Sequence, residues 1–259
     1  MSELATGVRD VGRGLAVLKA HPRLWKWLIA PAVVTLLVLG AAIALIVHLV
    51  APAFDWVAAH VPGPLAATSS VVLTVVLVVG LGAAALVVFT PVAGTLAGPF
   101  CEQLSEHVEA ELTGAPAPPF ALSAFLHGAV LGVVHSIRRL IAALIGLVLV
   151  FAIGLVPVIG TVAAVVVAGW LAGRAAAYDC YDAVLARRNL AYRDKLAYLG
   201  RHRGRSLGLG LAVAAMLNVP GLNLIALGIG AAGATVADHA MAAARRRAPD
   251  SAPRNDRTR

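Results

Sequence analysis

Two long uncharged runs of apolar residues predict two transmembrane helices. Residues 27–50 and 68–90 each exceed the roughly 18 apolar residues that mark a membrane helix. The first run is also longer than the core of a signal peptide, roughly 7–15 residues, so we expect it to remain as a span. The segment between the runs, 51–67, contains three prolines and predicts a loop. The polar segment 1–26 predicts a partly amphipathic helix at the membrane interface.

A change from continuous to periodic hydrophobicity predicts an amphipathic helix after the second run. In 99–113, PFCEQLSEHVEAELT, an apolar residue recurs every four positions from Leu104, and glutamates fill the opposite face. Pro99 suits the first turn of a helix and Gly114 suits its end. We expect this helix to lie outside the hydrocarbon, along the membrane surface.

Two later apolar segments are each interrupted by proline and glycine, and they predict helical hairpins. The first, about 141–173, breaks at PVIG, 157–160, and the second, about 206–237, breaks at VPGL, 219–222. Arms of 13–16 residues rise about 20–24 Å at about 1.5 Å per residue, which is less than the hydrocarbon core of about 30 Å. We therefore expect the hairpins to penetrate only partway.

The depth of these turns restricts their surroundings. Irregular backbone inside a membrane is tolerated only where it is buried in protein or lines a water-filled cavity. We therefore expect the two turns to face each other or a pore. A half-inserted hairpin also leaves part of the bilayer thickness uncovered, which favours a homo-oligomer.

Composition and charge support an integral membrane protein with a defined orientation. The 259 residues are 60% hydrophobic and 13% charged, with a net charge of +8. All 21 lysines and arginines fall in 9–26, 138–139, 174–205 and 245–259. Two single crossings and two returning hairpins place all four regions on one side, which the positive-inside tendency makes cytoplasmic. We expect one membrane domain over 1–244, followed by a basic, disordered tail, 245–259, with both termini cytoplasmic.

Each hairpin turn also starts a helix at membrane depth. Thr161 and Asn223 stand where an N-cap is expected, and the amide groups of a helix N-terminus favour anions. One N-terminus contributes only about 0.3–2 kcal/mol, and weak binding is what a conducting pathway requires. In the alternative reading, the turns simply close two space-filling hairpins.

The lack of charged residues in the apolar arms favours passive conduction. The arms contain no Asp, Glu, Lys or Arg, and His48 is the single titratable side chain in a predicted span. Proton-coupled carriers usually keep such a group inside the membrane.

Other chemistries lack the required patterns. A GxGxxG string at 228–233 has no second strand or following acid for a dinucleotide fold, so we expect no cofactor. The histidines lack metal-ligand spacing, and the spread of basic residues lacks a nucleic-acid-binding fold. Ser105, His107 and Glu109 are read as a solvated helix face, so no catalytic residue is predicted.

The basic clusters and the two cysteines indicate surroundings and do not mark a predicted site. The basic residues of 187–205 and 245–247 favour attraction to anionic lipid headgroups, with the gathering of anions at a cytoplasmic mouth as the alternative. Cys101 and Cys180 lie in segments placed near the cytoplasm, which argues against a disulfide.

Four segments together resemble the CysZ-type sulfate permeases and the wider etoposide-induced-protein domain family. They are GPFCEQLSEHVEAELTG at 98–114, LVPVIG at 155–160, AYDCYDAVLARRNLAYRDKLAYL at 177–199 and VPGLNLIALGIGAAGAT at 219–235. The similarity runs in order from about residue 7 to 240. It implies an all-α inner-membrane protein with two full transmembrane helices, two half-penetrating hairpins and interfacial amphipathic helices. It also implies an oligomer that admits sulfate without an identified energy source.

The resemblance places the expected anion site at the two turns and in front of the first span. The turn of the second hairpin matches at Pro220, Leu222 and Asn223, beside Gly221, and that of the first at Pro157 and Gly160, followed by Thr161.

The sequence departs from the family pattern at several positions. Where such permeases tend to carry an arginine pair before the first span, this chain has Trp25-Lys26, with Arg23 nearby. Lysine offers a point charge where arginine offers a bidentate fork for an oxyanion. Gly228 replaces a frequent proline, and Cys180-Tyr181 replaces a usual Asp-Tyr pair.

Two hypotheses follow from the sequence. The first is a passive permease for sulfate or a similar oxyanion, in which Arg23 and Lys26 collect the anion and the helix starts at Thr161 and Asn223 pass it. The alternative is a non-transporting membrane scaffold or envelope factor on the same fold.

Overall fold

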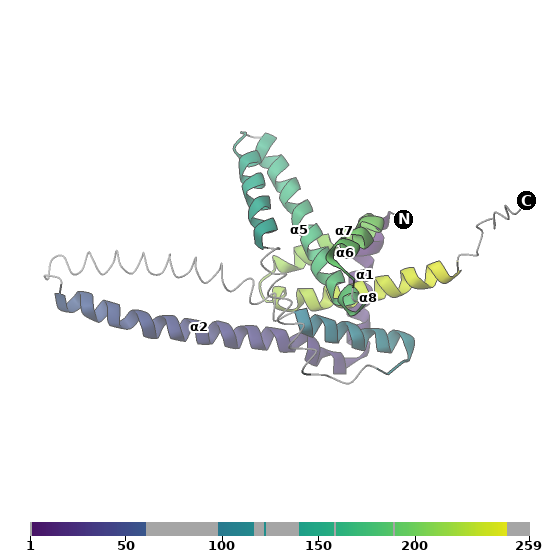
Figure 1. Ribbon diagram of the computed structural model, residues 1–259, viewed down its shortest axis with the longest axis horizontal. Helices are drawn as coiled ribbons and strands as arrows, with labels where there is room; N and C mark the ends of the chain where they lie inside the picture. Colours follow the sequence, from purple (N-terminus) through teal and green to yellow (C-terminus); the bar gives the residue numbers. More distant parts are fainter. Residues whose placement is uncertain are drawn as a thin grey trace, which may run out of the picture. The chain divides into compact units, whose positions relative to one another are not determined.

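A computed structural model of the protein describes residues 2–60, 98–116, 122, 140–157, 159–188 and 190–247. Every regular element in these residues is a helix, which confirms the predicted all-α class (Figure 1). The predicted second span, 68–90, and residues 248–259 of the predicted tail lie outside the described residues.

The chain forms two compact units, each assembled from separated segments. The first comprises Met1–Leu28, Cys101–Phe120 and Val150–Arg259, and the second comprises Ile29–Phe100 and Ala121–Leu149. Both hairpin turns and all the predicted site residues belong to the first unit.

The N-terminal segment forms helix α1, Glu3–Ala20, and not one helix over 1–26 as predicted. Ser2 caps its start, since the hydroxyl accepts a hydrogen bond from the Ala5 N–H at 3.4 Å. The helix ends because His21 precedes Pro22, and the proline ring disfavours a helical conformation in the residue before it. His21 accordingly has φ −124° and ψ 82°, and a short 3₁₀ helix, Pro22–Leu24, follows.

The first predicted span is part of a longer helix. Helix α2 is Trp25–His60, 36 residues, with its first turn in the first unit and the rest in the second. The loop predicted from residue 51 is therefore wrong over its first ten residues, since the helix continues through Pro52. A proline removes one backbone donor, a loss that helices in membranes tolerate where neighbouring groups satisfy the freed carbonyl.

The predicted amphipathic helix is confirmed over residues 98–113. Gly114 ends it with φ +71°, a left-handed conformation that favours glycine. Leu104 and Val108 are fully buried in the core of the first unit, as the four-residue spacing predicts.

The first hairpin has a longer second arm than predicted. Its first helix is Leu140–Gly154, and helix α5, Ile159–Leu185, continues past Gly173, the predicted end. Gly173 lies inside this helix and packs against helix α7, Arg203–Leu217, since a Cβ there would lie 2.7 Å from a side-chain carbon of Leu211. The 3₁₀ turn η2, Ala186–Arg188, follows α5.

The second hairpin matches its prediction at the turn. Helix α6 is Tyr192–Arg201, helix α7 is Arg203–Leu217, and helix α8 is Asn223–Arg247. The predicted arm end at residue 237 is wrong because α8 continues for ten more residues. Arg245–Arg247, assigned to the disordered tail, form its last turn.

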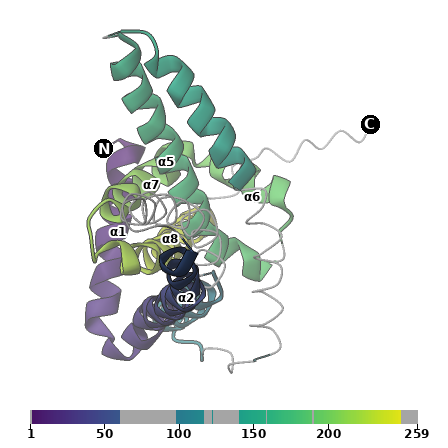
Figure 2. The ribbon, with the colours of Figure 1, turned by 90° about the vertical axis from the view of Figure 1, so that its left-hand side faces the viewer.

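The core of the first unit is formed by α1, α5, α7 and α8 (Figures 1 and 2). Backbones approach very closely where glycines meet. A Cβ on Gly7 would lie 2.0 Å from the Arg205 carbonyl oxygen, and one on Gly210 would lie 1.9 Å from that of Gly173. Small residues that permit such contacts are the usual basis of helix packing in membranes.

Three helices of the described residues are long and apolar enough to cross a membrane. They are Pro22–Leu45, Ile159–Arg188 and Asn223–Arg247. The last two contain the second arms of the hairpins, so helix length alone does not separate a full crossing from partial penetration. The half-penetrating arrangement stays a prediction.

Candidate anion site

The turn of the second hairpin is built by residues 218–222. Gly221 has φ +81°, which explains why glycine occupies this position. The Asn218 side chain donates to the Ala214 carbonyl at 2.7 Å and so caps the end of α7. Pro220 and Gly221 are exposed, whereas Leu222 is half-buried and packs against the core.

Asn223 is the first helical residue of α8, so the N-cap position predicted for it belongs to Leu222. Its side chain is exposed. The Asn223 N–H donates to the Val219 carbonyl at 3.1 Å, and the Ile225 N–H donates to the Leu222 carbonyl at 3.1 Å. Two of the first amides of α8 are therefore satisfied within the turn.

The turn of the first hairpin is tighter. Gly160 is buried against the preceding arm, since a Cβ there would lie 2.2 Å from the Ile153 carbonyl oxygen. Helix α5 begins at Ile159, so the predicted N-cap role of Thr161 is wrong: Thr161 is the third helical residue, with an exposed side chain. Pro157 is also exposed and stands outside the helix.

The two turns do not pack against each other within one chain. They lie apart in both views (Figures 1 and 2). Each turn has an exposed large apolar side chain: Ile159 at the first turn is 77% exposed, and Val219 at the second is 49% exposed.

The two predicted cationic collectors have different surroundings. Arg23 forms an ion pair with Glu111 of the amphipathic helix, and the His21 Nδ1 lies 3.3 Å from the same carboxylate. Lys26 is exposed, stands 5.3 Å from the centroid of the Trp27 ring, and forms no ion pair with a carboxylate of the described residues. Lys26 is therefore the more available of the two.

Packing brings the start of α2 close to the second turn. A Cβ on Gly228 would lie 2.4 Å from the Leu28 Cδ1, so Leu28 fills the space that the glycine leaves. Gly228 is five residues after Asn223, about 8 Å along a helix axis. This contact explains why glycine occupies position 228.

Sequence reasoning missed a set of buried ion pairs. Asp10 of α1 is fully buried, and Arg205 of α7 donates to it twice, from Nε at 2.5 Å and from a terminal nitrogen at 3.0 Å. Asp238 of α8 is buried and accepts hydrogen bonds from Arg188 and, at 2.6 Å, from the Tyr198 hydroxyl. A lone acid on an apolar helix face was the available signal, because such an acid is rarely buried without a partner.

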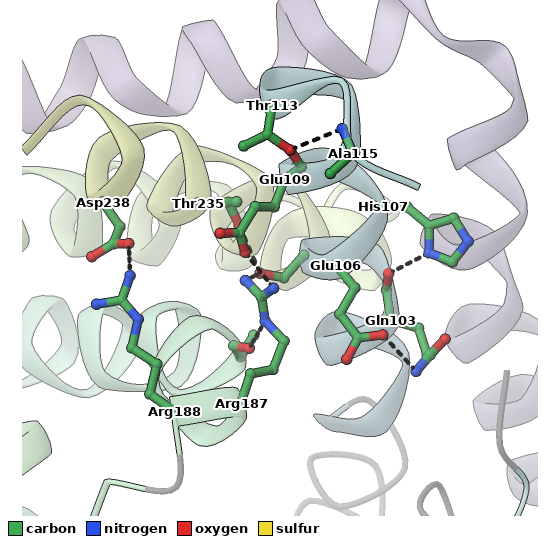
Figure 3. Close-up of polar contacts among 12 residues, drawn as sticks. Gln103, Glu106, His107, Glu109, Thr113, Ala115, Arg187, Arg188, Thr235 and Asp238 are labelled. Carbon is green, nitrogen blue, oxygen red and sulfur yellow. Dashed lines mark hydrogen bonds and ion pairs between the residues drawn. The ribbon is translucent and has the colours of Figure 1, made fainter. Parts of the chain in front are cut away.

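The amphipathic helix joins this network through Glu109, which points toward Arg187 (Figure 3), and through Ser105, which is buried and not solvated as predicted. Its hydroxyl lies 2.8 Å from the Thr235 hydroxyl and accepts a hydrogen bond from Arg187 at 2.9 Å. Arg187 also pairs with Glu109. His107 packs against the Trp27 ring at 5.3 Å between centroids.

Four cations of the predicted lipid-attracting cluster 187–205 are therefore engaged internally. They are Arg187, Arg188, Lys195 and Arg205, and Lys195 pairs with Asp182 at 2.6 Å. Glu102 lies beside that last pair, and its pKa is raised to about 7 by burial first and by Asp182 second. Among the described residues, no group of three His, Cys, Asp or Glu side chains is placed to hold a metal ion. Cys101 and Cys180 are both buried and unlinked.

The chain matches the family model described as sulfate transporter CysZ/etoposide-induced protein 2.4 over residues 10–227. The chain belongs to this family. No curated protein matches it. The matched region begins at the buried Asp10 and ends in the first turns of α8, so both hairpin turns and both cationic residues lie inside it.

Membership in the CysZ family confirms the resemblance found in the sequence. It associates the chain with a transporter family, and with its apolar helices it indicates a membrane protein. The description of the family names sulfate.

Proposed function

We propose that the protein is a passive permease for sulfate or a similar oxyanion in the inner membrane. The observation that carries the proposal is the turn 218–222, an irregular exposed segment in the middle of an apolar hairpin, followed by Asn223 at the start of α8. Family membership supports sulfate as the substrate class.

In this proposal the anion is collected electrostatically and passed by neutral donors. Lys26 gathers the anion in front of the hairpin, because it is exposed and forms no ion pair with a carboxylate of the described residues. The Asn223 side-chain amide and the open amides of the α8 N-terminus then replace part of its hydration shell. Arg23 contributes only when it leaves Glu111, so its main role is to hold the bend between α1 and α2.

The proposed membrane arrangement keeps both hairpins partly inserted and both termini cytoplasmic. Residues 203–217 form an arm of about 22 Å at about 1.5 Å per residue, below the core thickness of about 30 Å. Because the turns of one chain lie apart, a homo-oligomer supplies the remaining walls of the pathway.

The test is uptake of labelled sulfate into liposomes that contain the purified protein. We expect Asn223→Leu to lower uptake at all sulfate concentrations, since a donor that faces the anion is replaced by an apolar group. We expect Lys26→Ala to lower uptake mainly at low sulfate concentration and low ionic strength, since salt screens the electrostatic collection of the anion. Lys19→Ala, an exposed lysine at the end of α1, is the matched control and should behave like the native chain.

The proposal fails on either of two results. Uptake no greater than in empty vesicles favours the scaffold alternative. Equal uptake by the native chain and Asn223→Leu places the pathway elsewhere.

A further inference from the structure

Along one face of α5, the exposed residues change from apolar to aromatic and then to cationic. Ile159, Val162 and Val166 are 77%, 66% and 66% exposed, in the half of the helix that projects away from α7 and α8 (Figures 1 and 2). Trp170 follows Val166 by four positions and is 45% exposed, and Arg174 follows Val166 by eight positions and is also exposed. Because residues four apart lie on one helix face, an apolar stripe ends in an aromatic residue and then a cation.

Two contacts organise this boundary. The Arg174 guanidinium lies 4.8 Å from the centroid of the Trp170 ring. One turn further, the Tyr178 ring lies 5.7 Å from that of Tyr192, which is 43% exposed at the start of α6. No carboxylate of the described residues forms an ion pair with Arg174, in contrast to Arg187 and Arg188 on the turn that follows α5.

We propose that Trp170, Arg174 and Tyr192 form an interfacial site that binds the phosphate of an anionic phospholipid and sets how far the first hairpin enters the bilayer. The acyl chains lie along Val162 and Val166, and the phosphate meets Arg174. Tryptophan and tyrosine belong at this level because each has an apolar ring and a polar tip. The proposal rests on the membrane setting and is independent of sulfate transport.

Charge favours a lipid over a protein partner at this site. The exposed apolar stripe matches acyl chains. At its end, Arg174 forms no ion pair with a carboxylate of the described residues, so its charge matches a phosphate in the headgroup layer. If α5 instead crossed the bilayer over its whole length, Arg174 would face hydrocarbon, where a charged side chain is unfavourable.

The site fixes a depth that can be measured. Trp170 is eleven residues from Ile159, so about 16 Å of helix separates the headgroup level from the start of α5. That length is about half of the hydrocarbon core of about 30 Å.

Fluorescence quenching tests the depth. The variant with Trp25, Trp27 and Trp56 replaced by phenylalanine keeps Trp170 as its single tryptophan. In vesicles of brominated phosphatidylcholine, we expect bromine near the headgroup, at carbons 6 and 7, to quench at least twice as strongly as bromine at carbons 11 and 12. Stronger quenching by the deeper bromine, or quenching only by aqueous iodide, would overturn the proposal.

A second arm of the experiment tests the phosphate. In mixed vesicles, brominated phosphatidylglycerol should quench Trp170 at least twice as strongly as brominated phosphatidylcholine at the same mole fraction. The preference should disappear in Arg174→Gln and persist in Arg193→Gln, a matched change of an exposed arginine on α6. Equal preference in the two variants would overturn the proposal, whereas loss of sulfate uptake has no bearing on these readings.

Discussion

At the residue scale, the first unit is held together by charges that are buried and paired. Asp10 has no exposed surface, and its two oxygens accept three hydrogen bonds, two from Arg205 and one from Arg13 at 3.0 Å. An unpaired carboxylate at this depth would be protonated or would destabilise the fold. The pairing therefore explains how α1 carries an acid on the face that packs against α7.

Arg205 and Arg13 contact the same carboxylate and differ in burial, so they form a natural comparison. The Arg205 side chain is 15% exposed, and that of Arg13 is 56% exposed. We expect Arg205→Gln to lower the free energy of unfolding by about 3 kcal/mol, because it breaks a buried pair. Arg13→Gln should cost less than about 1 kcal/mol, as an exposed pair does. Denaturant unfolding in detergent measures both, and equal losses would contradict the assignment of Arg205 as the buried partner.

Glu102 predicts a pH-dependent stability. Burial and the neighbouring Asp182 raise its pKa from 4.5 to about 7, whereas Lys195 and Arg187 oppose the shift. The folded protein therefore retains a proton that the unfolded chain releases, so stability falls as the pH rises from about 4.5 to about 7 and is level above that. Glu102→Gln removes this penalty. Its stability relative to the native chain should rise through the same window and remain higher above pH 7.

Thermal unfolding at several pH values measures this difference. Asp194→Asn, a change of an exposed carboxylate on α6, is the control. The same pH-dependent gain in both variants would show that the effect does not come from the pocket around Glu102.

Residues that act locally were predictable, and residues that act over long distances were not. Gly221 was identified from its neighbours because a turn of this kind requires the left-handed conformation that glycine adopts. The pair of Asp10 and Arg205 is separated by 195 positions, and no local pattern marks it. The same reason explains why Ser105 was assigned to a solvated face: its partners Thr235 and Arg187 lie far along the chain.

At the element scale, the apolar pattern predicts which segments form helices, whereas the positions of the helix ends depend on packing. The turn at 218–222 was placed well because proline and glycine terminate helices wherever they occur together. The apolar pattern ends where charged residues begin and therefore predicts ends at 173 and 237, which are too early for α5 and α8. Both helices continue, since their charged turns find partners in the first unit.

The packing of α1 depends on glycine at defined positions, and two glycines of this helix differ sharply. A Cβ on Gly14 would lie 2.4 Å from the Gly233 backbone nitrogen on α8, whereas one on Gly12 would meet nothing within 4 Å. We expect Gly14→Ala to destabilise the protein by about 1–3 kcal/mol, because α1 and α8 must separate. Gly12→Ala should stabilise it by up to about 1 kcal/mol through helix propensity.

Unfolding of the two variants, side by side, measures the contrast. Both substitutions add the same methyl group to the same helix, so propensity cancels between them. A stabilised Gly14→Ala variant would mean that α1 does not pack against α8 in this register.

At the scale of the whole molecule, charge is concentrated in helices that pack together and is lacking where the chain is apolar. The described arms 141–154, 159–173 and 206–217 contain no Asp, Glu, Lys or Arg. The titratable groups of the first unit instead form pairs such as Lys195 with Asp182. A transporter that couples to protons requires a group that changes charge along the pathway. Within the proposed permease function, this distribution in the described arms supports movement of the anion down its own electrochemical gradient.

Passive conduction makes a quantitative prediction for liposomes that take up labelled sulfate. Sulfate carries two negative charges, so a potential of about 100 mV, negative inside, opposes its entry by about 4.6 kcal/mol. At equilibrium this corresponds to an internal concentration lower by about three orders of magnitude. We expect a potassium diffusion potential of that sign to suppress the plateau of uptake, and the opposite potential to raise it. Collapsing a pH gradient at constant potential should leave the plateau unchanged. Uptake that follows the pH gradient and ignores the potential would require coupled proton movement. Vesicles without protein supply the baseline.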